Sequence, residues 1–152
     1  ELKHWDLSYW SKRLEEKTFG FKEEDIRPYF PIDKVLNGLF ALAKKLFNIS
    51  IIPAKKSPSV WHTDVMFFDV FDSKSKKQLA SFFLDPYSRL ESKRGGAWMN
   101  ECMIRHKEES EKIVLPVAYL ICNFSSPVGE KPSLLTFEEV TTLFHEFGRH
   151  LG

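Results

Sequence analysis

Long apolar runs are absent from this sequence of 152 residues, and cysteine is scarce. No stretch reaches the roughly 20 consecutive apolar residues that a membrane-spanning helix needs, so we expect no membrane partner. The two cysteines, Cys102 and Cys122, form no C-x-x-C pair, and we expect both to be buried thiols, as in a reducing compartment. The first residues show no signal-peptide pattern. These observations predict a cytoplasmic protein, or an organellar one if a presequence is missing.

An excess of charge of one sign is also absent, because 22 Lys and Arg balance 21 Asp and Glu to give a net charge of +1. Nucleic-acid-binding domains usually carry a marked positive excess, so we expect no nucleic-acid partner. The sequence also has no G-x-S-x-G, P-loop or G-x-G-x-x-G motif, which leaves serine hydrolases and nucleotide-binding enzymes without support. Aromatic residues, in contrast, are abundant, with 14 Phe and 4 Trp.

Apolar periodicity predicts helices in the first third of the chain. Asp6 can cap a helix that carries Leu7, Trp10 and Leu14 on one face. A stronger helix is indicated between residues 32 and 46, and Asn48 is a suitable residue to end it. Its apolar stripe consists of Ile32, Val35, Leu36, Leu39, Leu42, Ala43 and Leu46.

The middle of the chain is rich in aromatic and β-branched residues, which favour strands. We expect a short strand at 49–53, a hairpin formed by 65–71 and 79–84, and a buried strand at 117–122. The polar segment 102–112 is predicted to be an exposed loop or a frayed helix. The fold class is therefore α+β, with helices packed on a small, mainly antiparallel sheet in one domain spanning residues 1–152.

The last segment predicts a helix with two distinct faces. Thr136 and Glu139 form a T-x-x-E capping box, which marks a helix start near Thr136. An apolar stripe follows, consisting of Val140, Leu143, Phe144, Phe147 and Leu151. At about 100° per residue, the opposite face carries Glu138, Thr142, His145 and Arg149, with Glu146 beside it. If the apolar stripe is buried, this opposite face looks into a cleft.

This polar face carries part of a zinc-peptidase motif. In H-E-x-x-H, two His one turn apart bind the metal and the Glu acts as general base. Here His145-Glu146-Phe147-Gly148 is followed by Arg149 at the second ligand position and by His150 one place later. His150 is a second candidate ligand, but on a regular helix it lies about 140° around from His145. A frayed last turn would relax this restriction.

Further blocks along almost the whole chain carry a more specific pattern. They are Val60-Trp61-His62, Phe83-Leu84-Asp85-Pro86-Tyr87-Ser88-Arg89, Lys93-Arg94-Gly95-Gly96-Ala97-Trp98-Met99, Leu115-Pro116-Val117-Ala118-Tyr119-Leu120, Cys122-Asn123-Phe124 and residues 127–137. Together with the His-Glu segment, these blocks resemble the thimet oligopeptidase family, and most closely its oligopeptidase A branch.

This resemblance implies a zinc endopeptidase that cleaves short peptides in a deep channel. It implies that His145 corresponds to the first zinc ligand and Glu146 to the catalytic base, with one zinc ion in the intact enzyme. Arg149 occupies the place of the second His, and the family's third ligand, a Glu on a later helix, has no counterpart here. We therefore expect zinc binding to be weak or absent and this chain alone to be inactive.

Two explanations of the altered motif remain open: a substitution or insertion of Arg, or a truncated or mis-joined reading that ends the match at Gly148. We favour the second. Two functions also remain open, a segment of a zinc oligopeptidase or a non-catalytic remnant or binding module. Because the family's helical shell is missing, we expect exposed apolar surface and self-association.

Other candidate residues are more simply explained by structure. His62 could be a ligand, but a surface or packed histidine is the favoured interpretation. Asp85 and Arg89 follow a predicted strand and could bind substrate. Turn chemistry and an internal salt bridge are preferred for this pair.

Overall fold

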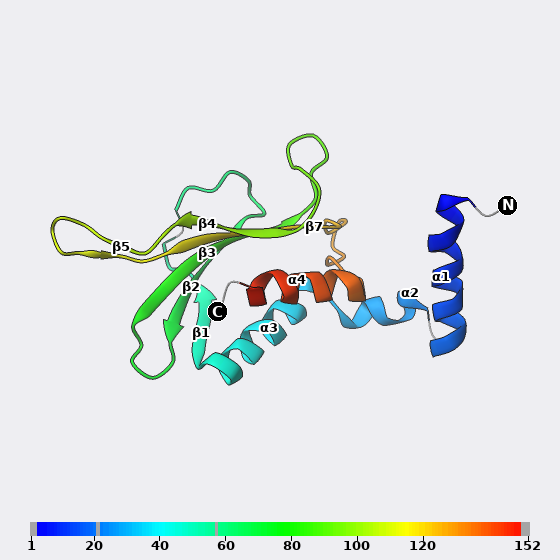
Figure 1. The fold of residues 1–152 in the computed structure, drawn as a ribbon, viewed down its shortest axis with the longest axis horizontal. Helices are drawn as coiled ribbons and strands as arrows, with labels where there is room; N and C mark the ends of the chain where they lie inside the picture. The colour runs from blue at the N-terminus through cyan, green and yellow to red at the C-terminus, as the bar shows by residue number, and fades with distance from the viewer. Residues whose placement is uncertain (1–2, 21, 57, 150–152) are drawn as a thin grey trace.

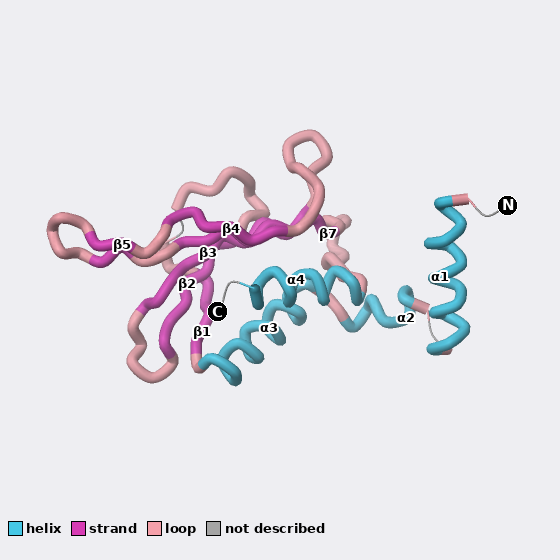
Figure 2. Tube along the Cα trace, in the orientation of Figure 1, coloured by secondary structure: helices cyan, strands magenta, loops and turns pink. Residues whose placement is uncertain are grey.

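The computed structural model describes residues 3–20, 22–56 and 58–149. It has a mixed sheet with two long helices packed on one face and the first helix to its side (Figures 1 and 2). Its elements are α1 (His4–Phe19), α2 (Glu23–Ile26), a 3-10 helix η1 (Arg27–Tyr29), α3 (Ile32–Phe47), β1 (Ile49–Pro53), β2 (Met66–Asp72), β3 (Gln78–Tyr87), β4 (Trp98–Met103), β5 (His106–Lys107), β6 (Ile113–Val114), β7 (Val117–Phe124) and α4 (Phe137–Arg149). The α+β prediction is confirmed.

The main sheet has five strands in the order β1-β2-β3-β7-β4. The β1–β2, β2–β3 and β4–β7 pairs are antiparallel, whereas β3 and β7 run parallel. The predicted, mainly antiparallel sheet is therefore confirmed, with one parallel pair at its centre. Parallel neighbours need a long connection, and here that connection contains β4 and the small β5–β6 hairpin.

The core lies between the sheet and helices α3 and α4. As predicted, α3 ends at Asn48, whose left-handed backbone (φ 57°) terminates the helix. Five residues of its predicted stripe are buried, but Leu42 and Leu46 are exposed. From the sheet, alternate residues point to the same core: Ile49, Ile51, Phe68, Val70, Phe82, Leu84, Leu120, Cys122 and Phe124.

The first residue of helix α1 and the packing of its apolar face both differ from the prediction. The helix begins after Lys3, whose backbone N–H donates to the Asp6 carboxylate at 2.8 Å. Asp6 is therefore the third helical residue and closes a capping box rather than being the N-cap. Leu7, Trp10 and Leu14 are all exposed, and the helix lies to the side of the sheet (Figure 1).

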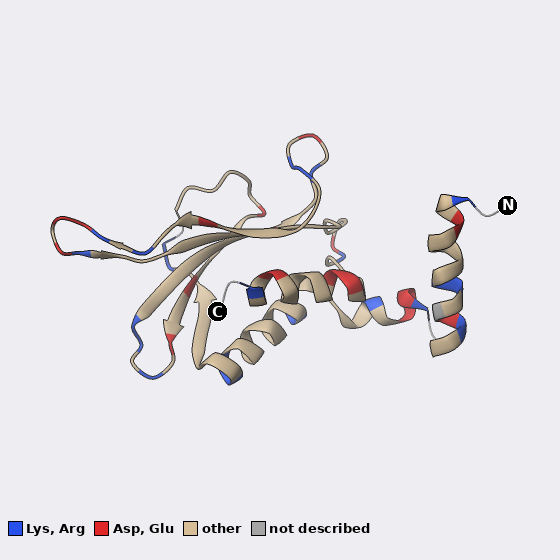
Figure 3. Cartoon of the chain, in the orientation of Figure 1, with Lys and Arg blue, Asp and Glu red and all other residues tan. Residues whose placement is uncertain are grey.

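The segment 102–112 is exposed, as predicted, but the expectation of a loop or frayed helix missed the short strands that it contains. Strand β4 continues to Met103, and His106–Lys107 then pairs with Ile113–Val114 as the β5–β6 hairpin. Glu111, at φ 65°, lies in the connecting turn. Both faces of this arm are exposed and carry mixed charges (Figure 3), so the sequence lacks the apolar alternation that marks a half-buried strand.

Candidate active-site helix

The start of α4 is fixed by the predicted capping box. The backbone N–H of Thr136 donates to Glu139 Oε2 at 2.8 Å, and the backbone N–H of Glu139 donates to Thr136 Oγ1 at 3.0 Å. Two backbone N–H groups at the helix start, which have no acceptor within the helix, are thereby hydrogen-bonded. The predicted helix start is confirmed.

The predicted apolar stripe attaches α4 to the sheet. Leu143 and Phe147 are buried, and Val140 and Phe144 pack against the same core. The Phe147 ring meets Phe82 of β3 edge to face, with ring centroids 5.8 Å apart. The helix contacts β7 and β4 (Figure 1), whereas Leu151, the last residue of the stripe, lies outside the described residues.

The candidate site residues lie on the other side of α4. His145 and Arg149 are exposed and Glu146 is half-buried. Because both His145 and Arg149 are helical, they are one turn apart on the same face. His150 lies outside the described residues. Within 3–20, 22–56 and 58–149, no group of three or more His, Cys, Asp or Glu side chains is arranged to hold a metal ion.

The two cysteines have different environments. Cys122 is buried, as predicted, and burial raises the pKa of its thiol to about 12, an effect that Lys93 opposes and Glu146 reinforces. Cys102 is exposed, contrary to prediction, because it lies on edge strand β4, and its thiol donates to the Tyr119 hydroxyl at 3.0 Å. Both thiols are free.

A buried ion cluster lies at the end of β3, where an internal salt bridge was predicted. Arg89 binds the Asp85 carboxylate with both guanidinium nitrogens, at 2.9 and 2.6 Å, which confirms the prediction. Lys93 Nζ lies 3.0 Å from Asp85 Oδ1, and Trp61 Nε1 donates to Oδ2 at 3.0 Å. Sequence reasoning missed these last two partners.

Hydrogen bonding favours the ionised form of Asp85 in this cluster. Burial alone would raise the pKa of Asp85, but the hydrogen bonds from Arg89, Trp61 and Lys93 outweigh it, so the pKa is lowered. Burial lowers the pKa of Lys93, and its hydrogen bond to Asp85 opposes that effect.

His62, the other histidine considered as a ligand, is half-exposed, with Nδ1 3.4 Å from Asp64 Oδ2.

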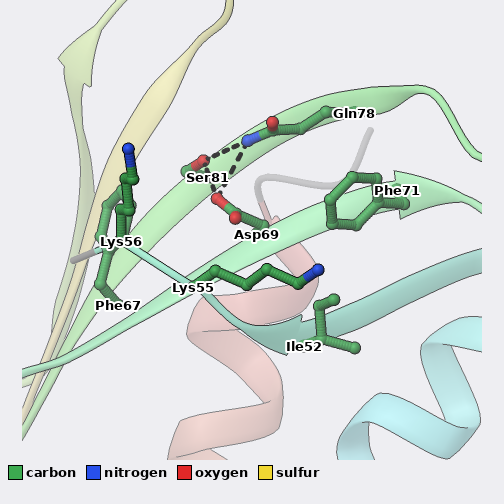
Figure 4. A pocket seen from close by; sticks show the side chains of 8 residues that line it. All are labelled: Ile52, Lys55, Lys56, Phe67, Asp69, Phe71, Gln78 and Ser81. Atoms are coloured by element: carbon green, nitrogen blue, oxygen red, sulfur yellow. Dashed lines mark hydrogen bonds between the residues drawn. The ribbon is translucent and has the colours of Figure 1, made fainter.

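A hollow of about 610 Å³ lies on the sheet face opposite α4 (Figure 4). Strand alternation places it there, because Phe67, Asp69 and Phe71 point away from the core that Phe68 and Val70 enter. Its polar floor is an internal network in which Ser81 and Gln78 donate to Asp69 at 2.8 and 2.9 Å. This hollow is separate from the His145 face of α4.

The model of Peptidase family M3 matches residues 1–151. The chain belongs to this family. It is 51% identical to organellar oligopeptidase A (chloroplastic/mitochondrial) and 50% identical to a probable cytosolic oligopeptidase A, both from Arabidopsis thaliana, over 99% of the chain in each case. It is 44% identical to oligopeptidase A from Escherichia coli, again over 99% of the chain.

The predicted resemblance to the oligopeptidase A branch is thus confirmed for this family M3 chain. The chain spans only 19% to 22% of the length of these three relatives. Among the described residues, no helix is long and apolar enough to cross a membrane.

Proposed function

We propose that this chain is a segment of the catalytic domain of a zinc-dependent oligopeptidase, which hydrolyses peptide bonds in short peptides. The observation that carries the proposal is α4, because its apolar face is attached to the sheet while His145 and Glu146 remain on its accessible side. The names of the relatives, all oligopeptidases A, support the substrate class. In this proposal α4 is a zincin-type active-site helix.

Each of the two residues has a defined role in this proposal. The His145 imidazole has a nitrogen lone pair that can bind zinc. The Glu146 carboxylate can accept a proton from an attacking water and return it to the leaving amine. Its half-buried position, near Cys122, limits its contact with bulk solvent. When bound, zinc would supply Lewis-acid polarisation of the scissile carbonyl.

The described residues do not suffice for such a zinc site. Arg149 stands one turn after His145, where H-E-x-x-H has its second imidazole. A guanidinium has only donors and a positive charge, so it cannot bind Zn²⁺ and repels it. His150 is the alternative ligand, but a regular helix directs it away from His145. We therefore propose that this chain alone binds zinc weakly and is inactive.

Metal content and peptide hydrolysis test this proposal together. After exchange into metal-free buffer, we expect the chain to retain far less than one zinc per molecule and to show no hydrolysis of a quenched-fluorescent peptide above background. Retention of about one zinc would contradict the interpretation of Arg149. Chelator-sensitive cleavage that Glu146→Gln abolishes would contradict inactivity, whereas cleavage that persists in Glu146→Gln indicates a contaminating peptidase.

A non-catalytic remnant or binding module is the second candidate function. Arg149 in the ligand position favours it, since the fold of the segment is kept while the motif is incomplete. This candidate predicts peptide binding without hydrolysis. Calorimetric titration with an uncleaved short peptide, in the presence of a chelator, would distinguish it from the peptidase segment.

Exposed apolar side chains lead us to propose that the isolated chain self-associates. Trp5, Tyr9, Trp10 and Leu14 of α1 are all more than half exposed, and exposed apolar patches of this kind promote association. We expect light scattering to report species larger than 17.8 kDa, and the double variant Trp5→Glu/Trp10→Glu to reduce them. A monodisperse monomer with a sharp melting transition would contradict this prediction.

For the cellular location, the names of the relatives cover both an organellar and a cytosolic protein. We propose a cytoplasmic location, with an organellar one as the alternative. Short peptides are the proposed partners, whereas no nucleic-acid or membrane partner is proposed.

A further inference from the structure

The connection between β3 and β4 is held at both of its ends. At its start, Lys93 Nζ donates to the backbone carbonyls of Asp85 and Tyr87 at 2.9 and 2.7 Å. Near its end, the Asn123 side-chain amide donates to the carbonyl of Arg94 at 3.1 Å and to that of Gly96. Only the tip, with Leu90 almost fully exposed, extends away from the sheet. Trp98, the first residue of β4, follows directly.

Asp85 is the common ion-pair partner of Lys93 and Arg89. Its side chain is only 2% exposed, and those of Lys93 and Arg89 are 7% and 16% exposed. A carboxylate buried among two cations stabilises an arrangement that neither cation could keep alone, since an unpaired buried charge is costly. Asp85 lies next to an irregularity in the register between β3 and β7. The next residue is Pro86, which has no backbone N–H to donate to a neighbouring strand.

The same carboxylate also holds a second loop. Trp61 donates to Asp85, and its ring packs on Phe83 and Tyr119 at centroid distances of 5.3 and 5.6 Å. Residues 58–64 are thereby attached to the sheet face opposite α4. One buried side chain therefore links the end of β3, the connection to β4 and the segment around Trp61.

We propose that Asp85 is a positioning residue of the peptidase site, which fixes β4 over helix α4 through Lys93 and Arg89. This inference rests on the proposed function, because only then does the β4–α4 geometry belong to an active site. The structural basis is independent of zinc: α4 contacts β4, and Met99 of β4 packs against the same core as Phe144 of α4.

The distance between β4 and α4 provides a direct test in the full 152-residue chain. Spin labels are attached at Asn100→Cys and Thr141→Cys, both exposed, in a Cys102→Ser background. Cys122 is buried and protonated, so it reacts slowly with the label. We expect pulsed electron paramagnetic resonance to give one narrow distance in this parent, and a distribution at least about twofold broader after Asp85→Asn or Lys93→Met.

The matched control is Asp69→Asn. Asp69 is also a sheet carboxylate, but its partners Ser81 and Gln78 are neutral, so we expect the distance distribution to keep the parental width. The double variant Asp85→Asn/Lys93→Met should broaden the distribution by less than the sum of the two single changes, because both single changes break the Asp85–Lys93 ion pair. Circular dichroism confirms that each variant is folded.

Three outcomes would overturn the inference. The first is a folded Asp85→Asn or Lys93→Met with the parental distribution, and the second is equal broadening in Asp69→Asn. If Asp85→Asn does not fold, Arg89→Gln, which alters the most exposed of the three charged side chains, takes its place. The third outcome is that Asp85→Asn, Lys93→Met and Arg89→Gln all fail to fold, because Asp85 would then stabilise the whole sheet rather than position β4. Retention of about one zinc per chain or chelator-sensitive cleavage, with these distances as expected, would contradict only the proposed inactivity and would leave this inference in place.

Discussion

Leu143→Ala is expected to lower the free energy of unfolding by about 2–5 kcal/mol. Leu143 has no exposed surface and lies in the middle of the apolar face with which α4 meets the sheet. Removing its side-chain atoms leaves a cavity between helix and strands, which the packed neighbours fill only in part. Urea denaturation followed by circular dichroism measures the change.

Leu46→Ala provides the matched control for this prediction. It is the same substitution on a helix of the same core, but Leu46 is 62% exposed, so we expect a change within about 0.5 kcal/mol. If Leu143→Ala were as mild as Leu46→Ala, α4 would not be attached through its apolar face, and the accessible position of His145 would have no structural basis.

Arg149→His is expected to tighten zinc binding by about tenfold or more, equivalent to about 1.4 kcal/mol. The change places a second imidazole one turn after His145 on the same exposed face, and it removes a cation from the metal's position. We expect no gain in peptidase activity, because a catalytic zinc needs three protein ligands and two are then present. Isothermal titration with zinc measures the affinity.

Arg94→His serves as the control for a general effect of added histidine. Arg94 is exposed in the β3–β4 connection, so its replacement should leave zinc affinity unchanged. Unchanged affinity in Arg149→His as well would show that the helical register at residues 145–149 is mistaken. Restored cleavage would show that a third ligand comes from this chain, and His62 and Glu138 would be tested first.

The parts of the fold that the sequence predicts are those governed by local periodicity. The stripe of α3, the capping box of α4 and the β2–β3 hairpin depend on residues a few positions apart, and the structure has all three. The β5–β6 hairpin depends on pairing between two exposed segments. No apolar alternation marks it, so it was predicted as a loop or frayed helix.

The same distinction holds for the candidate site. His145 and Glu146 follow from motif spacing on one helix, and their roles remain proposals. The full environment of Asp85 could not be predicted, because Trp61 lies 24 residues before it and Lys93 eight residues after it. Only the Arg89 contact, four residues away, was near enough to be proposed from the sequence.

The parallel pairing of β3 with β7 sets an order of events during synthesis. Strand β7 lies between β3 and β4, so the edge of β3 stays unpaired until the chain has been made as far as Phe124. Strand β4, although completed earlier, has no neighbour to join before then. During this interval the apolar strand edge is open to pairing with other chains. This part of the newly made polypeptide is therefore open to aggregation through β3 between the completion of β3 and the arrival of β7.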